Sequence, residues 1–436
     1  MKKRVLAALL ATTMVGTMLT GCGAGDTAAA GSSDSASSEA AADGDVSITI
    51  FNSKSEVQDQ FVEMAEEYSE KTGVNVEIYY SSDTVAAHLA TKYAANDPYT
   101  IAMVDPKDVY ALAEEYAADL SGEKWIDNTD YEIEIGGKVV GFPTCIEARG
   151  IMYNADAIKN ITGKDFDPTA YATLDDFNAL LDELRAGGME NPTGIMKEDW
   201  SLAAHFLAEV YEQHEDPEAF MQTLYEGSAD LMKDAKFGSL FDTFDTLKAN
   251  NYAVSSPIAA EREVSEQKLA EGEIAFMFGG NWDWSMINAY DYSENMGMMP
   301  VPQNTDDGTN AKLVGGASKY LFIDGTDNTS DAQRQAAKDF LNWLVFEADG
   351  NSFLTEKCAL VPAFNNIDAS SLDPLSLSVK SYADKGALVP NYNYLPDDHI
   401  SLAGAIMQEY LADQIDREGL ATKLQDYFKG ATAIEH

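Results

Sequence analysis

Hydrophobic and polar positions alternate along the first part of the chain in a way that predicts strands and helices in turn. Residues 46–50 alternate as a half-buried strand does. From Ser55, the expected N-cap, to Gly73, the expected end, apolar residues fall on one helical face. Alternation resumes over residues 74–80. The unit is therefore strand, helix, strand, with two parallel strands and the helix on one side of the sheet.

A third strand and a hairpin extend this pattern. The run "TIAMVD", residues 100–105, predicts a strand, and Pro106 suits the first turn of the helix after it. Farther along, "YEIEIGGKVVGFP" indicates a hairpin that turns at Gly136 and Gly137. The first part of the chain therefore predicts an α/β fold.

The middle of the chain, residues 156–269, is dominated by helical patterns, which marks a second lobe. Thr173 and Asp176 predict a capping box for one helix, and "SLAAHFLAEVY" predicts another. Near the end of the chain, Ser330 and Gln333 predict the capped start of a further helix with a broad apolar face.

Length and charge limit what the chain does. With 436 residues it is too long for one comfortable core, which favours about two domains. Its 29 Lys and Arg residues stand against 73 Asp and Glu residues, a formal charge of −44. Such a charge repels phosphate backbones and anionic membrane surfaces, so nucleic acid is not expected as a partner.

The N-terminus has the features of an export signal. "MKKR" is basic, "VLAALLATTMVGTM" is apolar but short for a membrane span, and "LTGC" places small residues before Cys22. This order resembles the lipobox of bacterial lipoproteins. The resemblance implies a signal peptide over residues 1–21 and a lipid on Cys22 that anchors the chain to the outer face of the cell membrane. Residues 22–45 then form a flexible tether; an ordinary secretory signal is the alternative.

Polar residues follow each of the first three strands. Ligands of open α/β sheets bind beyond the carboxyl ends of the strands, where loops and helix N-termini offer unpaired donors. The candidates are Asn52, Ser53 and Lys54 after the first strand, Ser81, Ser82 and Asp83 after the second, and Asp105 and Lys107 after the third. Each one alone is better explained as a cap or turn residue, so it is the set that indicates a binding site.

Five segments, in order, resemble a known family. They are "FVEMAEEYSEKTGVNVEI", "GKVVGFPTCIEARGIMYN", "LAEGEIAFMFGGNWDWSMI", "MGMMPVP" and "AAKDFLNWLVFEADG". Together they resemble the family 1 extracellular solute-binding proteins of carbohydrate ABC transporters, the group that includes the maltose-binding protein. The resemblance covers nearly the whole chain after the tether. It implies a monomer without a cofactor that captures an oligosaccharide by hinge closure and delivers it to the permease subunits of an ABC transporter.

The resemblance also implies the organisation of the fold, a two-lobed periplasmic-binding-protein-like fold of type II with an interlobe hinge. The N-terminal lobe is expected over residues 46–145 and 311–361, and the C-terminal lobe over residues 146–310 and 362–436. The chain then crosses the hinge several times, and the sugar lies in the cleft between the lobes.

The stretch "FMFGGNWDWSMI" carries the sharpest site prediction. In the resembled family the first tryptophan of a "GPWAW"-like segment stacks on the sugar, and Trp282 occupies that place. An aromatic ring covers the C–H face of a sugar while carboxylates and amides bind its hydroxyls. Asn281 and Asp283 would add such polar groups, whereas Trp284 is expected to pack under the helix that begins there. The alternative is that both tryptophans are core residues.

Other positions of the family carry over less evenly. Glu147 matches a glutamate that reaches the sugar and Arg149 would orient it, although a purely structural Glu147–Arg149 pair explains both residues as well. Lys54 matches a polar position after the first strand. After the third strand the maltose binders have a tryptophan, where this chain has Val104 and Asp105. That departure puts a maltose-type ligand in doubt.

Two further loops supply candidates. "MKEDW" aligns with a loop that contacts sugar in the family, which favours Asp199 and Trp200. "PNYNYLPDD" offers Tyr392 or Tyr394 as an aromatic platform, and turn packing explains these tyrosines almost as well. The resemblance leaves open which sugar is bound, and a non-sugar solute such as a polyamine is an alternative ligand.

A secreted glycoside hydrolase is the main alternative function. It needs two carboxylates at a defined separation, which a sequence does not reveal. The chain has no GxSxG, HExxH, GxGxxG or P-loop motif, and its five histidines lack ligand spacing, so no metal is expected. An adhesive surface protein would predict repeats or a stalk, which the sequence lacks. Cys145 and Cys358 show no CxxC spacing and are expected as buried free thiols rather than as a disulfide.

Overall fold

The computed structural model describes residues 46–81 and 85–433; the export signal, Cys22, the tether, Ser82 and Asp83 lie outside these ranges. The strands are β1 (Ser47–Phe51), β2 (Asn75–Tyr79), β3 (Ile101–Val104), β4 (Ile133–Ile135), β5 (Lys138–Asn154), β6 (Thr193–Gly194), β7 (Phe276–Gly280), β8 (Met296–Met299), β9 (Leu313–Ile323), β10 (Val361–Pro362) and β11 (Leu388–Val389).

The helices lie mainly between and after these strands. They are α1 (Gln58–Thr72), α2 (Val85–Ala94), α3 (Pro106–Tyr116), α4 (Ala155–Thr162), α5 (Leu174–Ala186), α6 (Ala208–Glu212), α7 (Pro217–Tyr225), α8 (Ala235–Ala249), α9 (Arg262–Ala270), α10 (Trp284–Ile287), α11 (Asp331–Phe346), α12 (Ala348–Ser352), α13 (Pro374–Asp384), α14 (His399–Leu411) and α15 (Arg417–Gly430). Short helical turns used below are η1 (Ser55–Val57), η4 (Ser201–Leu207) and η7 (Asn281–Asp283).

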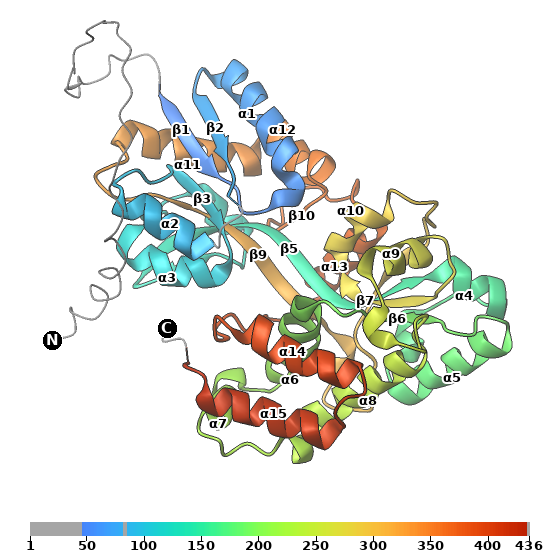
Figure 1. The fold of residues 1–436 in the computed structure, drawn as a ribbon. Helices are drawn as coiled ribbons and strands as arrows, with labels where there is room; N and C mark the ends of the chain where they lie inside the picture. Colours follow the sequence, from blue (N-terminus) through green and yellow to red (C-terminus); the bar gives the residue numbers. More distant parts are fainter. Residues whose placement is uncertain (1–45, 82–84, 434–436) are drawn as a thin grey trace, which may run out of the picture. The chain divides into compact units, whose positions relative to one another are not determined.

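Strands β5 and β9 connect the two ends of the described sheet. The strand order is β2-β1-β3-β9-β5-β7-β6, with β4, β8 and β10 paired to β5 and β11 paired to β9. β1 pairs in parallel with β2 and β3, which confirms the predicted strand–helix–strand unit. β9 pairs antiparallel with both β3 and β5. In Figure 1, β5 and β9 run side by side from the group around β1–β3 to the group around β7 and α4–α9.

The hydrophobic cores lie at the two ends of these long strands. Near β1–β3, Trp125 and Phe340 of α11 belong to one buried cluster, to which β5 contributes Phe142. Near β7, Phe206 belongs to another, to which β5 contributes Ile151. A single strand thus enters several hydrophobic clusters, because side chains along it meet different helices as it advances. The α/β class predicted from the pattern is confirmed.

Several local predictions are confirmed in atomic detail. Gly136 and Gly137 turn the hairpin between β4 and β5 with φ of 61° and 81°, a left-handed conformation that favours glycine. Ser330 and its partner in the capping box, Gln333, start α11 through two reciprocal hydrogen bonds. The two cysteines in the described part, Cys145 and Cys358, are free and buried.

Two helix starts differ from the pattern. Ser55 does not cap α1, because one 3-10 turn, η1, comes first and α1 begins at Gln58 without a side-chain cap. The segment "SLAAHFL" forms a π-helical stretch, η4, before α6. A π-helix widens the turn and changes which residues share a face, so the 3.6-residue period does not reveal which side chains point outward there.

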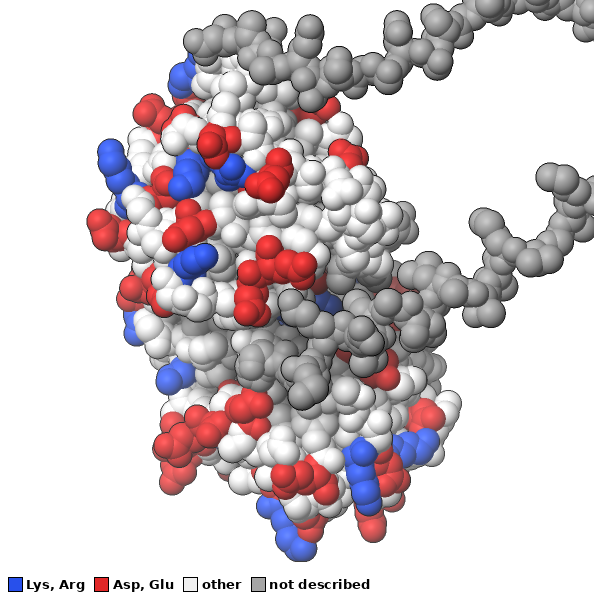
Figure 2. Space-filling view, turned by 90° about the vertical axis from the view of Figure 1, so that its left-hand side faces the viewer, with Lys and Arg blue, Asp and Glu red and all other residues white. Residues whose placement is uncertain are grey.

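The surface carries both signs of charge. On the face shown in Figure 2, acidic and basic side chains are interspersed among uncharged areas and do not form a basic stripe of the kind that binds nucleic acid. Among the residues that the structure describes, no helix is both long enough and apolar enough to span a bilayer.

Candidate ligand-binding site

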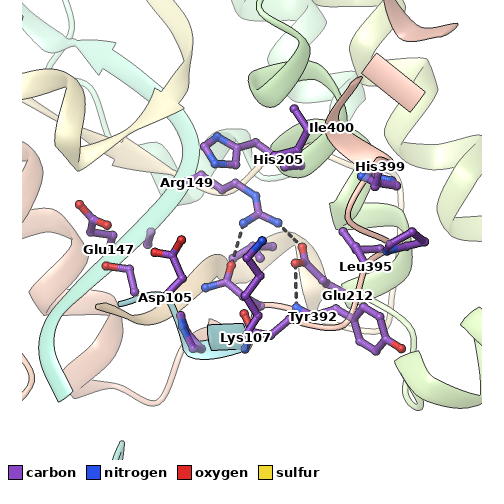
Figure 3. A pocket seen from close by; sticks show the side chains of 18 of the residues that line it. Asp105, Lys107, Glu147, Arg149, His205, Glu212, Tyr392, Leu395, His399 and Ile400 are labelled. Carbon is purple, nitrogen blue, oxygen red and sulfur yellow. Dashed lines mark hydrogen bonds and ion pairs between the residues drawn. The ribbon is translucent and has the colours of Figure 1, made fainter. Parts of the chain in front are cut away.

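A cavity of about 320 Å³, called here the first cavity, is lined by residues of the paired strands β5 and β9 in the region where these strands pass from one end of the sheet to the other. Residues from distant parts of the chain line it (Figure 3). Asp105 and Lys107 come from the start of α3, Glu147 and Arg149 from β5, and Tyr392 from the loop before α14. Together with Trp282, six residues predicted from the sequence therefore meet at one cavity.

A second cavity of about 290 Å³ adjoins the first. Both cavities are lined by Glu147 and Trp282, which therefore form the border between them. Lys54 and Asn281 line the second cavity, together with Trp284 at the start of α10. Each cavity is close to the lower end of the size range of small-molecule sites, and the pair together lies well within it.

Lys54 and Glu147 form the ion pair at this border. The Lys54 Nζ lies 2.7 Å from Glu147 Oε1 and 2.6 Å from Glu56 Oε1. Burial by itself would raise the pKa of Glu147, but the nearby Lys54 ammonium outweighs it and holds that pKa below its ordinary value. Glu147 is therefore an ionised hydrogen-bond acceptor at neutral pH.

Asn52 holds the backbone of Lys54 in place through hydrogen bonds. Its side-chain amide donates to the Lys54 carbonyl at 3.0 Å and to Gln58 Oε1 at 2.8 Å, and its Oδ1 accepts the Lys54 N–H at 2.9 Å. Asn52 is fully buried and lines neither cavity. Asn52 was expected to reach a ligand, but its side chain instead holds the backbone of Lys54. The turn at the end of β1 has backbone N–H and C=O groups that need hydrogen-bond partners, and Asn52 supplies them.

Arg149 is not paired with Glu147, which corrects the structural pair considered from the sequence. Its guanidinium donates to Glu212 of α6, and its Nη1 donates to Asn391 Oδ1 at 2.7 Å. Glu212 Oε1 also accepts the backbone N–H of Tyr392 at 2.9 Å. Residues 147 and 149 find partners on different sides of the cavity because β5 is crossing from one core to the other. Arg149 thereby holds the 391–396 loop against the first cavity.

A second buried carboxyl group lies beside Arg149. Glu209 Oε1 is 3.9 Å from Arg149 Nε, and its Oε2 accepts the side-chain amide of Gln213 at 3.0 Å. Burial raises the pKa of Glu209 to about 8, although Arg149 opposes the rise. One guanidinium thus serves two buried carboxyl groups, and Glu209 is mainly protonated at neutral pH.

Gly279 and Gly280, the two residues before Asn281, lack side chains because the side chains of Asp283 and Trp282 occupy that space. A Cβ on Gly280 would lie 2.2 Å from the six-membered ring of Trp282, and a Cβ on Gly279 would lie 2.1 Å from Asp283 Oδ2. The indole of Trp282 therefore lies over Gly280, half-buried, with its ring centroid 4.9 Å from that of His205. Trp284, by contrast, is buried in a core cluster, as expected.

The neighbours of Trp282 make contacts within the protein. Asn281 Oδ1 accepts the Ala148 N–H at 3.1 Å. Asp283 is buried and lines neither cavity, because its carboxylate accepts two hydrogen bonds from Arg262 Nη1, at 2.9 and 3.0 Å. The expectation that Asp283 faces a ligand is therefore corrected: its carboxylate is used to anchor the turn.

The remaining candidates lie around the first cavity at different depths. Asp105 is the N-cap residue of α3, but its side chain makes no capping hydrogen bond and pairs instead with Lys319 of β9. Asp199 and Trp200 are half-buried and line neither cavity. Tyr394 lies beside Tyr110, with 5.4 Å between the ring centroids, and so connects the loop before α14 to α3.

Sequence reasoning missed several residues of the site, among them His205, Glu212 and Asn391, which line the first cavity, and Lys319, which pairs with Asp105. His205 and Glu212 lie in a segment whose pattern predicted only a helix, and a polar residue within an apolar helical run was the available signal. Burial, with the nearby Arg149 and Arg262 charges, keeps the pKa of His205 well below its ordinary value, so this ring is neutral against Trp282.

Comparison with known proteins identifies a family and a shared fold. A family model described as bacterial extracellular solute-binding protein matches residues 63–384. No curated protein sequence matches the chain. Apo RafE from Streptococcus pneumoniae has a TM-score of 0.71 at 16% identity, over 89% of this chain and 98% of that one. RafE in complex with raffinose gives 0.69 at 17%, over 88% and 99%. A Bacillus licheniformis sugar transporter protein in complex with stachyose gives 0.63 at 18%, over 88% and 99%.

At these identities the structural likeness establishes the fold, while the family model covers most of the chain. The chain belongs to the family of bacterial extracellular solute-binding proteins.

Proposed function

We propose that this protein binds an oligosaccharide in the two adjoining cavities and delivers it to an ABC transporter permease. The observation that carries the proposal is the half-buried ring of Trp282, which lines both cavities together with the ionised Glu147. A ring and a carboxylate side by side suit the C–H face and the hydroxyl rim of one sugar unit. The raffinose and stachyose complexes of structural neighbours support this ligand class.

The charges around the cavities favour a neutral ligand over a polyamine. Glu147 is paired with Lys54, Asp105 with Lys319, and Arg149 with Glu212. Apart from the exposed Asp397 at the first cavity, a cationic ligand would have to take one of these carboxylates from a partner that is itself buried or half-buried, which costs about 3–5 kcal/mol for a buried pair. Sugar hydroxyls both donate and accept, so they bind such pairs without separating them.

The ligand contacts that we propose are those lining the cavities, namely Trp282, Asn281, Glu147, Arg149, Lys54, Asp105, Lys107 and Tyr392. Asn52, Asp283, Asp199, Trp200 and Tyr394 would act by supporting these residues. We infer binding rather than glycoside hydrolysis, because the matching family model and the structural neighbours are those of solute-binding proteins.

The proposed mechanism is closure of two lobes about the crossing strands. The expected lobes, residues 46–145 with 311–361 and residues 146–310 with 362–436, would each supply one wall of the site. Ligand that bridges both walls favours the closed state by the difference in its contacts between the two states. In the cell we propose a monomer held outside the membrane by the lipid on Cys22.

A sugar panel tests this function. Purified protein is titrated by calorimetry with raffinose, stachyose and chito-, malto-, xylo- and manno-oligosaccharides, with spermidine as the cationic comparison. We expect at least one sugar to bind and to be recovered intact after prolonged incubation. Shortened sugar would indicate a hydrolase, and binding of spermidine alone would overturn the ligand class.

Two tryptophan variants sharpen the same test. Trp282→Ala should lower sugar affinity about 30- to 1,000-fold, a loss of roughly 2–4 kcal/mol, with little change in the melting temperature of the empty protein. Trp284, which lines the second cavity but is buried in a core cluster, is the comparison: Trp284→Ala should destabilise the empty protein by about 3–5 kcal/mol because it leaves a core cavity, and should lower sugar affinity less than Trp282→Ala does. The reverse pattern would mean that the platform is the other tryptophan.

A further inference from the structure

One arginine outside both cavities touches the two structural elements that form the aromatic wall of the first cavity. Arg262, at the start of α9, donates from Nη1 to Asp283 in η7 and from Nη2 to Ser201 Oγ in η4, the latter at 2.8 Å. Its guanidinium also stacks on the ring of Trp200, with 4.3 Å to the ring centroid. Glu198 Oε2 lies 3.6 Å from Arg262 Nε.

The η7 side of this network fixes the backbone of Trp282. Asp283 Oδ2 accepts the Gly280 N–H at 3.1 Å, so the arginine-bound carboxylate also closes the turn around Trp282. On the other side, Asn281 is held by the Ala148 N–H of β5. Trp282 therefore lies between two anchored neighbours, and Arg262 supplies one of the two anchors.

The η4 side of the network fixes the ring that packs against Trp282. Ser201 is the first residue of η4, and His205 lies one turn farther along the same π-helical segment. The Trp200 ring, on which the guanidinium stacks, also meets the His205 ring edge-on, with 5.2 Å between centroids. Arg262 thus sets the separation of two elements that meet at the Trp282–His205 contact.

We propose that Arg262 is a positioning residue of the binding site: it ties the turn that carries Trp282 to the segment that carries His205, and so fixes the aromatic wall of the first cavity before ligand arrives. This proposal rests on the proposed function for its effect on sugar affinity. Its structural content, a fixed position of Trp282, does not depend on which ligand binds.

The chemistry of the contact explains why the residue is arginine. A planar guanidinium can stack with one face on an indole while its N–H groups, which lie in the plane of the guanidinium, donate to a carboxylate and a hydroxyl. A lysine ammonium has no such plane and cannot satisfy the three contacts together. Arg262→Lys keeps the charge and removes the geometry, whereas Arg262→Gln removes both.

A double-mutant cycle tests whether Arg262 acts through Trp282. Arg262→Gln and Arg262→Lys should each lower the affinity for the tightest sugar of the panel by about tenfold, roughly 1.4 kcal/mol. In the Trp282→Ala background the same changes should have little further effect, because the group being positioned is gone. Equal losses in both backgrounds, or unchanged affinity in the single variants, would overturn the proposal.

A matched control separates positioning from general stability. Arg417 also bridges two carboxylates, Asp242 and Asp245, and lines neither cavity. Arg417→Gln is expected to change the melting temperature at most and to leave sugar affinity as it was. If Arg417→Gln lowers affinity as much as Arg262→Gln does, the effect is one of global stability and the proposal fails.

A ligand-free measurement keeps the two proposals distinguishable. With 5-fluorotryptophan incorporated, the ¹⁹F resonance of Trp282 is assigned from the Trp282→Phe variant. We expect one sharp resonance in the parent protein, a shifted or broadened one in Arg262→Gln, and no change in Arg417→Gln. An unchanged resonance in Arg262→Gln would disprove positioning even if sugars bind, and a failed sugar panel would leave this readout intact.

Discussion

At the scale of single residues, the site is built from buried charges that are compensated by few partners. Arg149 serves both Glu212, through a hydrogen-bonded ion pair, and Glu209, whose nearer oxygen is 3.9 Å from Arg149 Nε. One positive charge cannot fully compensate two buried carboxylates in a medium of low polarity. The shortage is relieved by a proton on Glu209, whose pKa burial raises to about 8.

This arrangement predicts a pH dependence of stability. A carboxyl group whose pKa is raised by folding stabilises the fold fully below its ordinary pKa near 4.5, and this contribution is lost as pH rises through the folded value of about 8. Glu209→Gln cannot ionise, so its free energy of unfolding should fall less between pH 5 and 8 than that of the parent protein. The difference should be of the order of a few kcal/mol.

Denaturant unfolding at pH 5, 6.5 and 8 measures this difference. Glu190→Gln, which changes an exposed glutamate, is the matched control and should follow the parent protein. Parallel curves for Glu209→Gln and the parent protein would show that Glu209 is ionised in the folded state.

At the scale of elements, the site depends on how the end of β7 packs against the η7 turn. The two fit together because Gly279 and Gly280 at the end of β7 have no side chains. Gly280 ends β7 in an extended conformation, with φ of −145°, which any residue adopts. Its importance is steric, since the Trp282 ring occupies the space of a Cβ. The position of the platform is thus set by an absent side chain next to it.

Gly280→Ala should therefore impair binding more than folding. The added methyl group forces the Trp282 ring away from its place, and we expect sugar affinity to fall about tenfold or more, roughly 1.4 kcal/mol. Calorimetry and thermal melting of the variant measure both effects. Gly238→Ala, in α8 with open space around the new methyl group, is the control and should slightly raise stability without changing affinity. Normal affinity in Gly280→Ala would contradict the placement of the ring.

At the scale of the whole molecule, β5 and β9 are the elements that join the two cores. They pair antiparallel over residues 142–149 of β5, with register shifts at Cys145. Irregular pairing at such a point lets strands bend more easily than a regular ladder does. The two cavities lie at this crossing, so bending there would change the distance between their walls.

Closure predicts a measurable change in shape. With a saturating concentration of the tightest sugar, small-angle scattering should give a smaller radius of gyration than for the empty protein. Trp282→Ala at the same sugar concentration should keep the radius of the empty protein. Identical profiles for the parent protein with and without bound sugar would exclude closure as the mechanism of capture.

The sequence by itself determined the class of fold and the family. Strand alternation over residues 46–50 and 74–80, the glycine turn at Gly136 and the capping box at Ser330 are all local signals, because each depends on residues a few positions apart. The order of segments along the chain indicated a solute-binding protein, and the family match bears this out. Trp282 and Trp284 were also assigned to different environments from sequence, and they lie in different environments.

Only the tertiary structure decided which polar residues face the cavities and which support them. Asp283 and Asn52 belong to the predicted set but are buried against Arg262 and Lys54, while Glu212 belongs to no predicted set and fixes the cavity loop. These pairings join residues that are distant in sequence, and the partner of a buried charge is set by which elements pack together. A sequence pattern shows the periodicity of a single helix or strand. A buried ion pair instead depends on the distance between two helices or strands in the folded protein, which that periodicity does not contain.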